Sequence, residues 1–126
     1  MLIDQSVGRP NIPNSRKNNL FYLFPLFMSS IIVDLKDCDT VLEFLDRMIK
    51  ALKVTPFYGT NLEILGKTIS SLEKHGFAFP LTLKLDNTPG YKTKCPNGWK
   101  IFLTSLETAK EEYAKKEMIF NYSCTD

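Results

Sequence analysis

Hydrophobic side chains recur at helical spacing in three stretches of the chain, residues 40–54, 60–75 and 99–116. Side chains three or four positions apart share one face of a helix, so each stretch predicts an amphipathic helix. The predicted buried stripes are Val41, Leu45, Met48 and Leu52 in the first helix, Leu62, Leu65, Ile69 and Leu72 in the second, and Phe102, Leu106, Ala109 and Tyr113 in the third. Pro56 ends the first helix, because proline interrupts helical hydrogen bonding.

Two of these helices begin with a capping signal. A Ser or Thr followed three residues later by Glu forms a capping box at a helix start. Thr40 with Glu43 fits this pattern in the first helix, and Thr60 with Glu63 fits it in the second. Gly76 predicts a glycine C-cap for the second helix.

Three short segments have the pattern of β-strands. Residues 31–33 are apolar on both faces, as in a central strand of a parallel sheet. Residues 79–86 alternate between leucines and polar residues, which indicates an edge strand with one wetter face. Residues 118–124 are predicted to form the last strand. The order strand, helix, helix, strand, helix, strand predicts an α/β fold: a small three-stranded parallel sheet with helical crossovers.

The chain divides into a short leader, residues 1–27, and a single domain, residues 28–126. Most of the leader is polar without periodicity, which is typical of disorder. Its end, residues 20–27, is a dense apolar run that resembles part of a secretory signal, but Pro25 interrupts it and no clear cleavage site follows. The run is also shorter than the ~20 apolar residues that span a bilayer. We interpret the leader as disordered, or as an upstream extension of the reading frame before Met28.

Composition excludes several classes of function. The net charge of +2 arises within the first 27 residues, because the remainder holds 13 basic and 13 acidic residues. A neutral domain gives little drive for nucleic-acid binding. Three cysteines without CxxC spacing predict reduced thiols in a cytoplasmic protein. The single histidine leaves no His/Cys cluster for zinc, so we expect neither metal nor cofactor.

Catalysis has little support in the pattern. His75 has no nucleophile or orienting acid at motif spacing, and it lies at a predicted helix end. Cys95, in a predicted loop at residues 87–98, is the one cysteine that merits a reactivity test. Cys38 and Cys124 are interpreted as small packing residues. No Gly-rich phosphate loop or HExxH motif is present, so we expect no enzymatic activity.

Residues 91–100 offer an alternative function. Lysines lie beside Tyr91 and Trp99, a combination that binds single-stranded nucleic acid in some regulators. A solvated loop with Trp99 in the core explains the same residues. We favour this second interpretation because the domain carries no net positive charge, and we expect no nucleic-acid partner.

Residues 56–72 are typical of a docking surface for a protein partner. Two aromatic residues, Phe57 and Tyr58, precede a turn at Gly59 and then a helix. The polar face of that helix carries Glu63, Gly66, Lys67 and Ser70.

The same stretch resembles the barstar family. Residues 56–65 read Pro-Phe-Tyr-Gly-Thr-Asn-Leu-Glu-Ile-Leu, and the family signature is aromatic-Tyr-Gly-x-Asn-Leu-Asp-x-Leu. The order of predicted elements over residues 31–124 also matches. The resemblance implies an intracellular immunity or antitoxin protein that blocks the active site of a nuclease toxin through residues 57–70. We also expect a protein that is monomeric when free and has no membrane partner.

The resemblance further assigns individual residues. Phe57 corresponds to the loop aromatic, Glu63 to the first acid, Gly66 to an exposed helix aromatic, Lys67 to the decisive aspartate, Ser70 to a hydroxyl and Glu107 to a glutamate of the last helix. The expected partner-binding residues are Phe57, Tyr58, Gly59, Asn61, Glu63, Gly66, Lys67, Ser70 and Glu107. In the family, the negative charge of the aspartate mimics phosphate, and Lys67 places a positive charge at that position. We therefore expect the target to be a nuclease other than barnase, with an acidic residue opposite Lys67.

Overall fold

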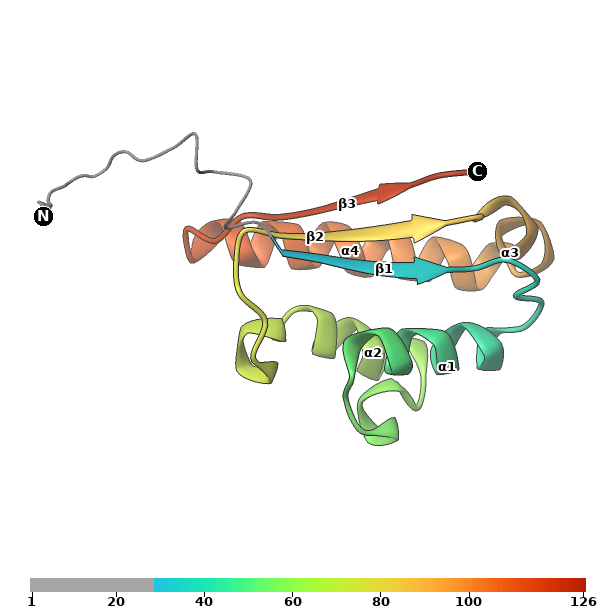
Figure 1. Cartoon of the computed structure of the whole chain (residues 1–126), viewed down its shortest axis with the longest axis horizontal. Helices are drawn as coiled ribbons and strands as arrows, with labels where there is room; N and C mark the ends of the chain where they lie inside the picture. The colour runs from blue at the N-terminus through green and yellow to red at the C-terminus, as the bar shows by residue number, and fades with distance from the viewer. Residues whose placement is uncertain (1–28) are drawn as a thin grey trace, which may run out of the picture.

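A three-stranded parallel sheet forms one layer of the computed structural model, which describes residues 29–126. The predicted leader at 1–27, including its apolar run at 20–27, lies outside the described residues. The strands are β1 (Ser29–Asp34), β2 (Leu81–Asp86) and β3 (Phe120–Cys124), in the order β1-β2-β3 (Figure 1). Both neighbouring pairs are parallel, which confirms the predicted α/β fold.

Six helical segments connect the strands. They are α1 (Val41–Leu52), the 3-10 turn η3 (Pro56–Gly59), α2 (Leu62–Ile69), the 3-10 turn η4 (Leu72–His75), α3 (Pro89–Lys94) and α4 (Pro96–Lys115). The capping box of Thr40 and Glu43 is present at the start of α1. Gly76 caps η4 with a φ of 90°, a left-handed conformation that glycine adopts without strain.

Two predicted boundaries are wrong. The second helix does not run to His75: α2 ends at Ile69, and a separate turn, η4, carries Leu72 into the core. The predicted loop at 87–98 is mostly helical, because Pro89 and Pro96 each occupy the first turn of a helix, where their missing N–H is not needed.

The predicted roles of the first two strands are also reversed. β2 is the central strand and β1 is an edge strand. Burial alternates along both, and Ile32 of β1 is 60% exposed. The helices therefore cover one face of the sheet and leave the other face exposed to solvent. For this reason even the central strand β2 has one solvent-exposed face.

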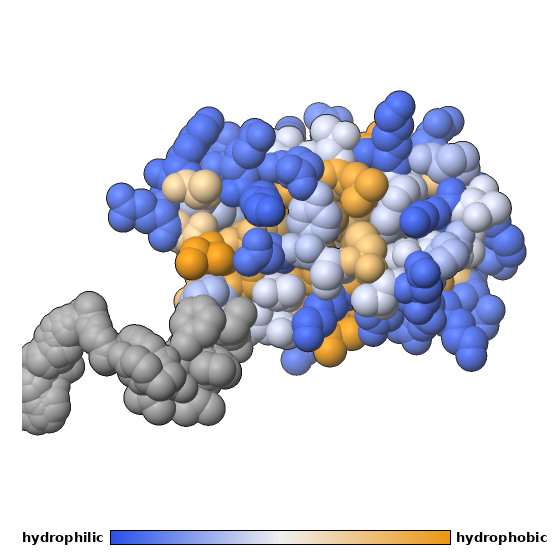
Figure 2. All heavy atoms as spheres, turned by 90° about the horizontal axis from the view of Figure 1, so that it is seen from above, coloured by the Kyte–Doolittle hydropathy of each residue, from blue (hydrophilic) through white to orange (hydrophobic). Residues whose placement is uncertain are grey.

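The core lies between the buried face of the sheet and the helices. The predicted stripe of the last helix is buried, as are the three leucines of β2. Tyr91 and Trp99 are also buried, so neither ring is free to stack on a base. Hydrophilic side chains cover most of the face seen in Figure 2, with small apolar areas between them.

The buried hydroxyl of Tyr91 allows a test of how this core is packed. The ring of Tyr91 stacks on Phe44 with a centroid distance of 4.7 Å, but its buried hydroxyl has no hydrogen-bond partner among the described residues. A buried hydroxyl without a partner costs free energy. We expect Tyr91→Phe to leave the free energy of unfolding unchanged or to raise it by about 1 kcal/mol, measured by urea denaturation. A loss above about 1 kcal/mol would contradict this expectation.

Candidate functional site

The turn before α2 differs from its predicted form. Thr60 has helical backbone angles and donates its Oγ1 hydrogen bond to the carbonyl of Phe57 at 2.8 Å. Asn61, which is extended, is the N-cap, and its Oδ1 accepts from the Ile64 N–H at 2.8 Å. The predicted Thr60–Glu63 capping box is therefore wrong. As a result, the Glu63 carboxylate is not used at the helix start.

Buried contacts hold this turn against the scaffold. The hydroxyl of Thr68 lies 2.9 Å from the carbonyl oxygen of Tyr58 and 3.0 Å from that of Ile64, which ties η3 to α2. Gly59 is buried, and a Cβ there would lie 2.5 Å from Cγ1 of Ile49. Gly59 therefore allows η3 to approach α1 and offers no side chain to a partner.

The aromatic residues of the turn lie at the surface. Phe57 is 66% exposed, and its ring meets Tyr58 edge to face at a centroid distance of 5.5 Å. Tyr58 in turn meets the ring of His75 at 4.7 Å. His75 therefore supports the turn from η4, and Phe57 remains available to a partner.

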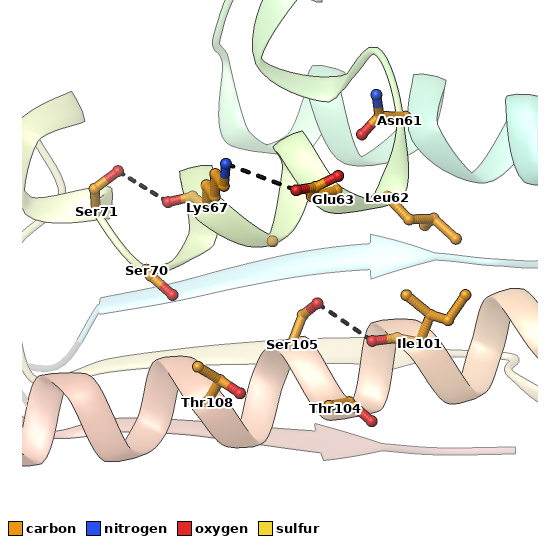
Figure 3. Close-up of a pocket in the computed structure, with 11 residues that line it drawn as sticks. Asn61, Leu62, Glu63, Lys67, Ser70, Ser71, Ile101, Thr104, Ser105 and Thr108 are labelled. Carbon is orange, nitrogen blue, oxygen red and sulfur yellow. Dashed lines mark hydrogen bonds and ion pairs between the residues drawn. The ribbon is translucent and has the colours of Figure 1, made fainter.

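A groove between α2 and α4 brings several predicted residues together. Its volume is about 800 Å³, and Figure 3 shows the two helices that form its walls. The predicted residues that line it are Asn61, Glu63, Gly66, Lys67 and Ser70. The opposite wall was not predicted from the sequence and consists of Ile101, Thr104, Ser105 and Thr108. Their helical spacing beside the apolar stripe of α4 is the signal that marks them as one face.

Gly66 sets the distance between the two helices. A Cβ on Gly66 would lie 2.7 Å from Oγ of Ser105 and 3.1 Å from its Cβ. Both distances are below van der Waals contact, so this glycine allows α2 and α4 to approach closely. The position is thus part of the floor of the groove as well as of the docking helix.

The charges of the groove are confined to α2. Nζ of Lys67 lies 3.7 Å from a carboxylate oxygen of Glu63, and the side chains are 77% and 80% exposed. Such an exposed i,i+4 pair contributes little stability. Both groups are therefore free to pair with charges on a partner.

Glu107 lies apart from the other expected contact residues. It does not line the groove, and its carboxylate accepts a hydrogen bond from the hydroxyl of Tyr122 in β3. This bond raises the pKa of Tyr122 to about 12. Glu107 therefore faces β3 and not α2.

The remaining candidates for chemistry are dispersed. The three cysteines are free: Cys38 is buried, Cys95 is half-buried and Cys124 is exposed, so the packing interpretation is wrong for Cys124. Residues 29–126 contain no group of three or more His, Cys, Asp or Glu side chains that could hold a metal ion. In the same part of the chain, every helix is too short or too polar to cross a membrane.

The chain matches a known family model over nearly all of its folded part. The model describes Barstar (barnase inhibitor) and matches residues 28–124, which include every strand and helix of the structure. A comparison with curated proteins gave no match. The family implies inhibition of a barnase-type ribonuclease as the general function. Motif, fold and family model agree, and the chain belongs to the barstar family.

Proposed function

We propose that this protein is an immunity-type inhibitor that covers the active site of a ribonuclease toxin with η3 and α2. The observation that carries this proposal is the exposure of one continuous set of residues. Phe57 is free on the turn, and Glu63 and Lys67 extend from the next helix. The turn is held by the hydrogen bond from the buried residue Thr68 to Tyr58 and by the close packing of Gly59 on Ile49. These side chains are therefore presented by a rigid support, which reduces the entropy lost on binding.

The charge of Lys67 limits which ribonucleases this inhibitor can bind. A ribonuclease holds phosphate with cationic side chains, and Lys67 stands where the family resemblance implies an aspartate. Like charges in close contact cost several kcal/mol in a desolvated interface. The proposed target is therefore a nuclease other than barnase, with an acidic residue opposite Lys67. We further propose that the inhibitor acts in the cytoplasm as a monomer when free, without catalytic activity of its own.

The direct test is inhibition of a purified ribonuclease encoded beside this gene, measured with a fluorogenic RNA substrate. We expect complete inhibition at one inhibitor per enzyme, and weak or no inhibition of barnase in the same assay. Full RNase activity in the presence of excess inhibitor would contradict the proposed function. Equal inhibition of barnase would contradict the proposed role of Lys67.

Phe57→Ala tests the turn. An exposed aromatic anchor at the centre of an interface often contributes a large share of the binding energy. We expect this variant to bind the ribonuclease about tenfold more weakly, with an unchanged free energy of unfolding, as measured by surface plasmon resonance and urea denaturation.

Ile32→Ala is the matched control for this variant. It removes an exposed apolar side chain of the open sheet face, where we propose no contact. Its affinity for the ribonuclease should stay within about twofold of the wild type, a change of roughly 0.4 kcal/mol. An equal loss of affinity in both variants would show that η3 is not a specific contact.

A further inference from the structure

The groove between α2 and α4 is more apolar than its residue types indicate. The hydroxyls of Ser71, Thr104 and Ser105 each donate to a carbonyl oxygen four residues earlier, at 3.1 or 3.2 Å. Such bonds satisfy hydroxyl donors on the backbone of the preceding turn, within α4 for Thr104 and Ser105 and at the end of α2 for Ser71. The surface that remains inside the groove is therefore largely carbon, and it offers a ligand few donors.

The strongest apolar character lies at one end of the groove. Leu62 and Ile101 flank that end, whereas Ser70 and Thr108 flank the other (Figure 3). Ile101 is 51% exposed although it is a large aliphatic residue. Between the two ends, Gly66 lies against Ser105 and forms the floor of the groove. The room for a partner's side chain therefore lies above this floor, beside Leu62 and Ile101.

Charges define how such a partner must be oriented. Among the lining residues, only Glu63 and Lys67 are charged, and both lie on α2. They have opposite signs and form only a loose pair, so a complementary surface carries a base near Glu63 and an acid near Lys67. Because both residues belong to the proposed docking helix, a protein that covers α2 also covers the groove.

We propose that the α2–α4 groove receives an aliphatic or aromatic side chain of the ribonuclease, flanked on the α2 side by an acidic and a basic residue. This inference rests on the proposed function and adds a second contact to it. The exposed turn inserts Phe57 into the enzyme, and the groove accepts an apolar residue from it. The inhibitor thus contributes both a protruding and a receiving surface.

The groove can be tested without the enzyme. We would titrate the ¹⁵N-labelled chain with N-acetyl-tryptophan amide and follow the amide signals of Gly66, Ile101 and Ser105 by NMR. We expect saturable shifts with an affinity on the order of millimolar, as for weak ligands of few atoms. N-acetyl-asparagine amide should cause none. The absence of saturable shifts with the tryptophan compound would overturn the proposal.

Thr104→Phe fills the groove from its exposed wall. We expect this variant to lose the shifts caused by the tryptophan compound and to bind the ribonuclease at least about tenfold more weakly, as expected when an interface pocket is blocked. Ala114→Phe adds the same ring to an exposed position of α4 outside the groove, and it should behave as the wild type. Thr108→Phe, one turn away, replaces Thr104→Phe if that variant does not fold.

The outcomes distinguish this inference from the proposed function. If Thr104→Phe inhibits the ribonuclease as well as the wild type while Lys67→Glu does not, the groove proposal is overturned and the function stands. If no ribonuclease is inhibited, the proposed function is wrong. A ribonuclease side chain is then also wrong as the occupant of the groove, even if the tryptophan compound binds there. If the wild type is a dimer by analytical ultracentrifugation and Thr104→Phe is a monomer, the occupant is a second copy, which also overturns the proposal.

Discussion

Replacing Lys67 by glutamate is expected to weaken binding of the cognate ribonuclease by about a hundredfold or more. The lysine is 77% exposed on α2, so the substitution leaves the fold intact. In the complex it places a carboxylate against the acid that we propose on the enzyme, and like charges in a desolvated interface repel strongly. Isothermal titration calorimetry at two salt concentrations measures the loss.

Lys84→Glu is the control for this prediction. It makes the same change of charge on the exposed face of β2, so any effect of net charge on association appears equally in both variants. The double variant Glu63→Lys with Lys67→Glu keeps the net charge and reverses its arrangement along the helix. If that variant binds as the wild type does, the proposed surface on α2 is wrong.

Tyr113→Phe is expected to lower the free energy of unfolding by about 2–4 kcal/mol. The buried hydroxyl accepts from the N–H of Leu72 at 2.7 Å and donates to the carbonyl of Ile69. Its removal leaves both backbone groups buried without this partner, and each costs about 1–3 kcal/mol. Urea denaturation followed by circular dichroism measures the difference.

Tyr122→Phe is the matched control, because its hydroxyl bonds to the exposed carboxylate of Glu107 and not to buried backbone. Its loss should stay below about 1 kcal/mol, the range of exposed polar contacts. Equal losses of unfolding free energy in the two variants would show that the hydrogen bonds of Tyr113 stabilise the fold no more than an exposed hydrogen bond does. Since Tyr113 joins α4 to the end of α2, Tyr113→Phe should also increase hydrogen exchange in α2.

The predicted contact surface shows the limit of local patterns. The motif located Phe57 and the exposed face of α2, because a side chain's position on a turn or helix follows from its neighbours in sequence. It did not locate Ile101, Thr104, Ser105 and Thr108, because their proximity to α2 depends on how two distant helices pack. The expected contact at Glu107 was assigned by the family resemblance, and the structure directs this residue towards β3.

By itself, the sequence determined the class of fold, the capping box at Thr40 and most of the buried stripe of each long helix. In α1 the predicted stripe included Val41, which is half-buried, and omitted Phe44, which is fully buried. The correctly predicted features depend on residues a few positions apart, whose relative directions are set by backbone geometry.

Only the tertiary structure decided that β2 is central, that Asn61 caps α2 and that Gly66 meets Ser105. The physical reason is that these features depend on which segments, distant in sequence, pack against each other and bury their apolar surfaces. The same local pattern of residues is compatible with more than one such packing.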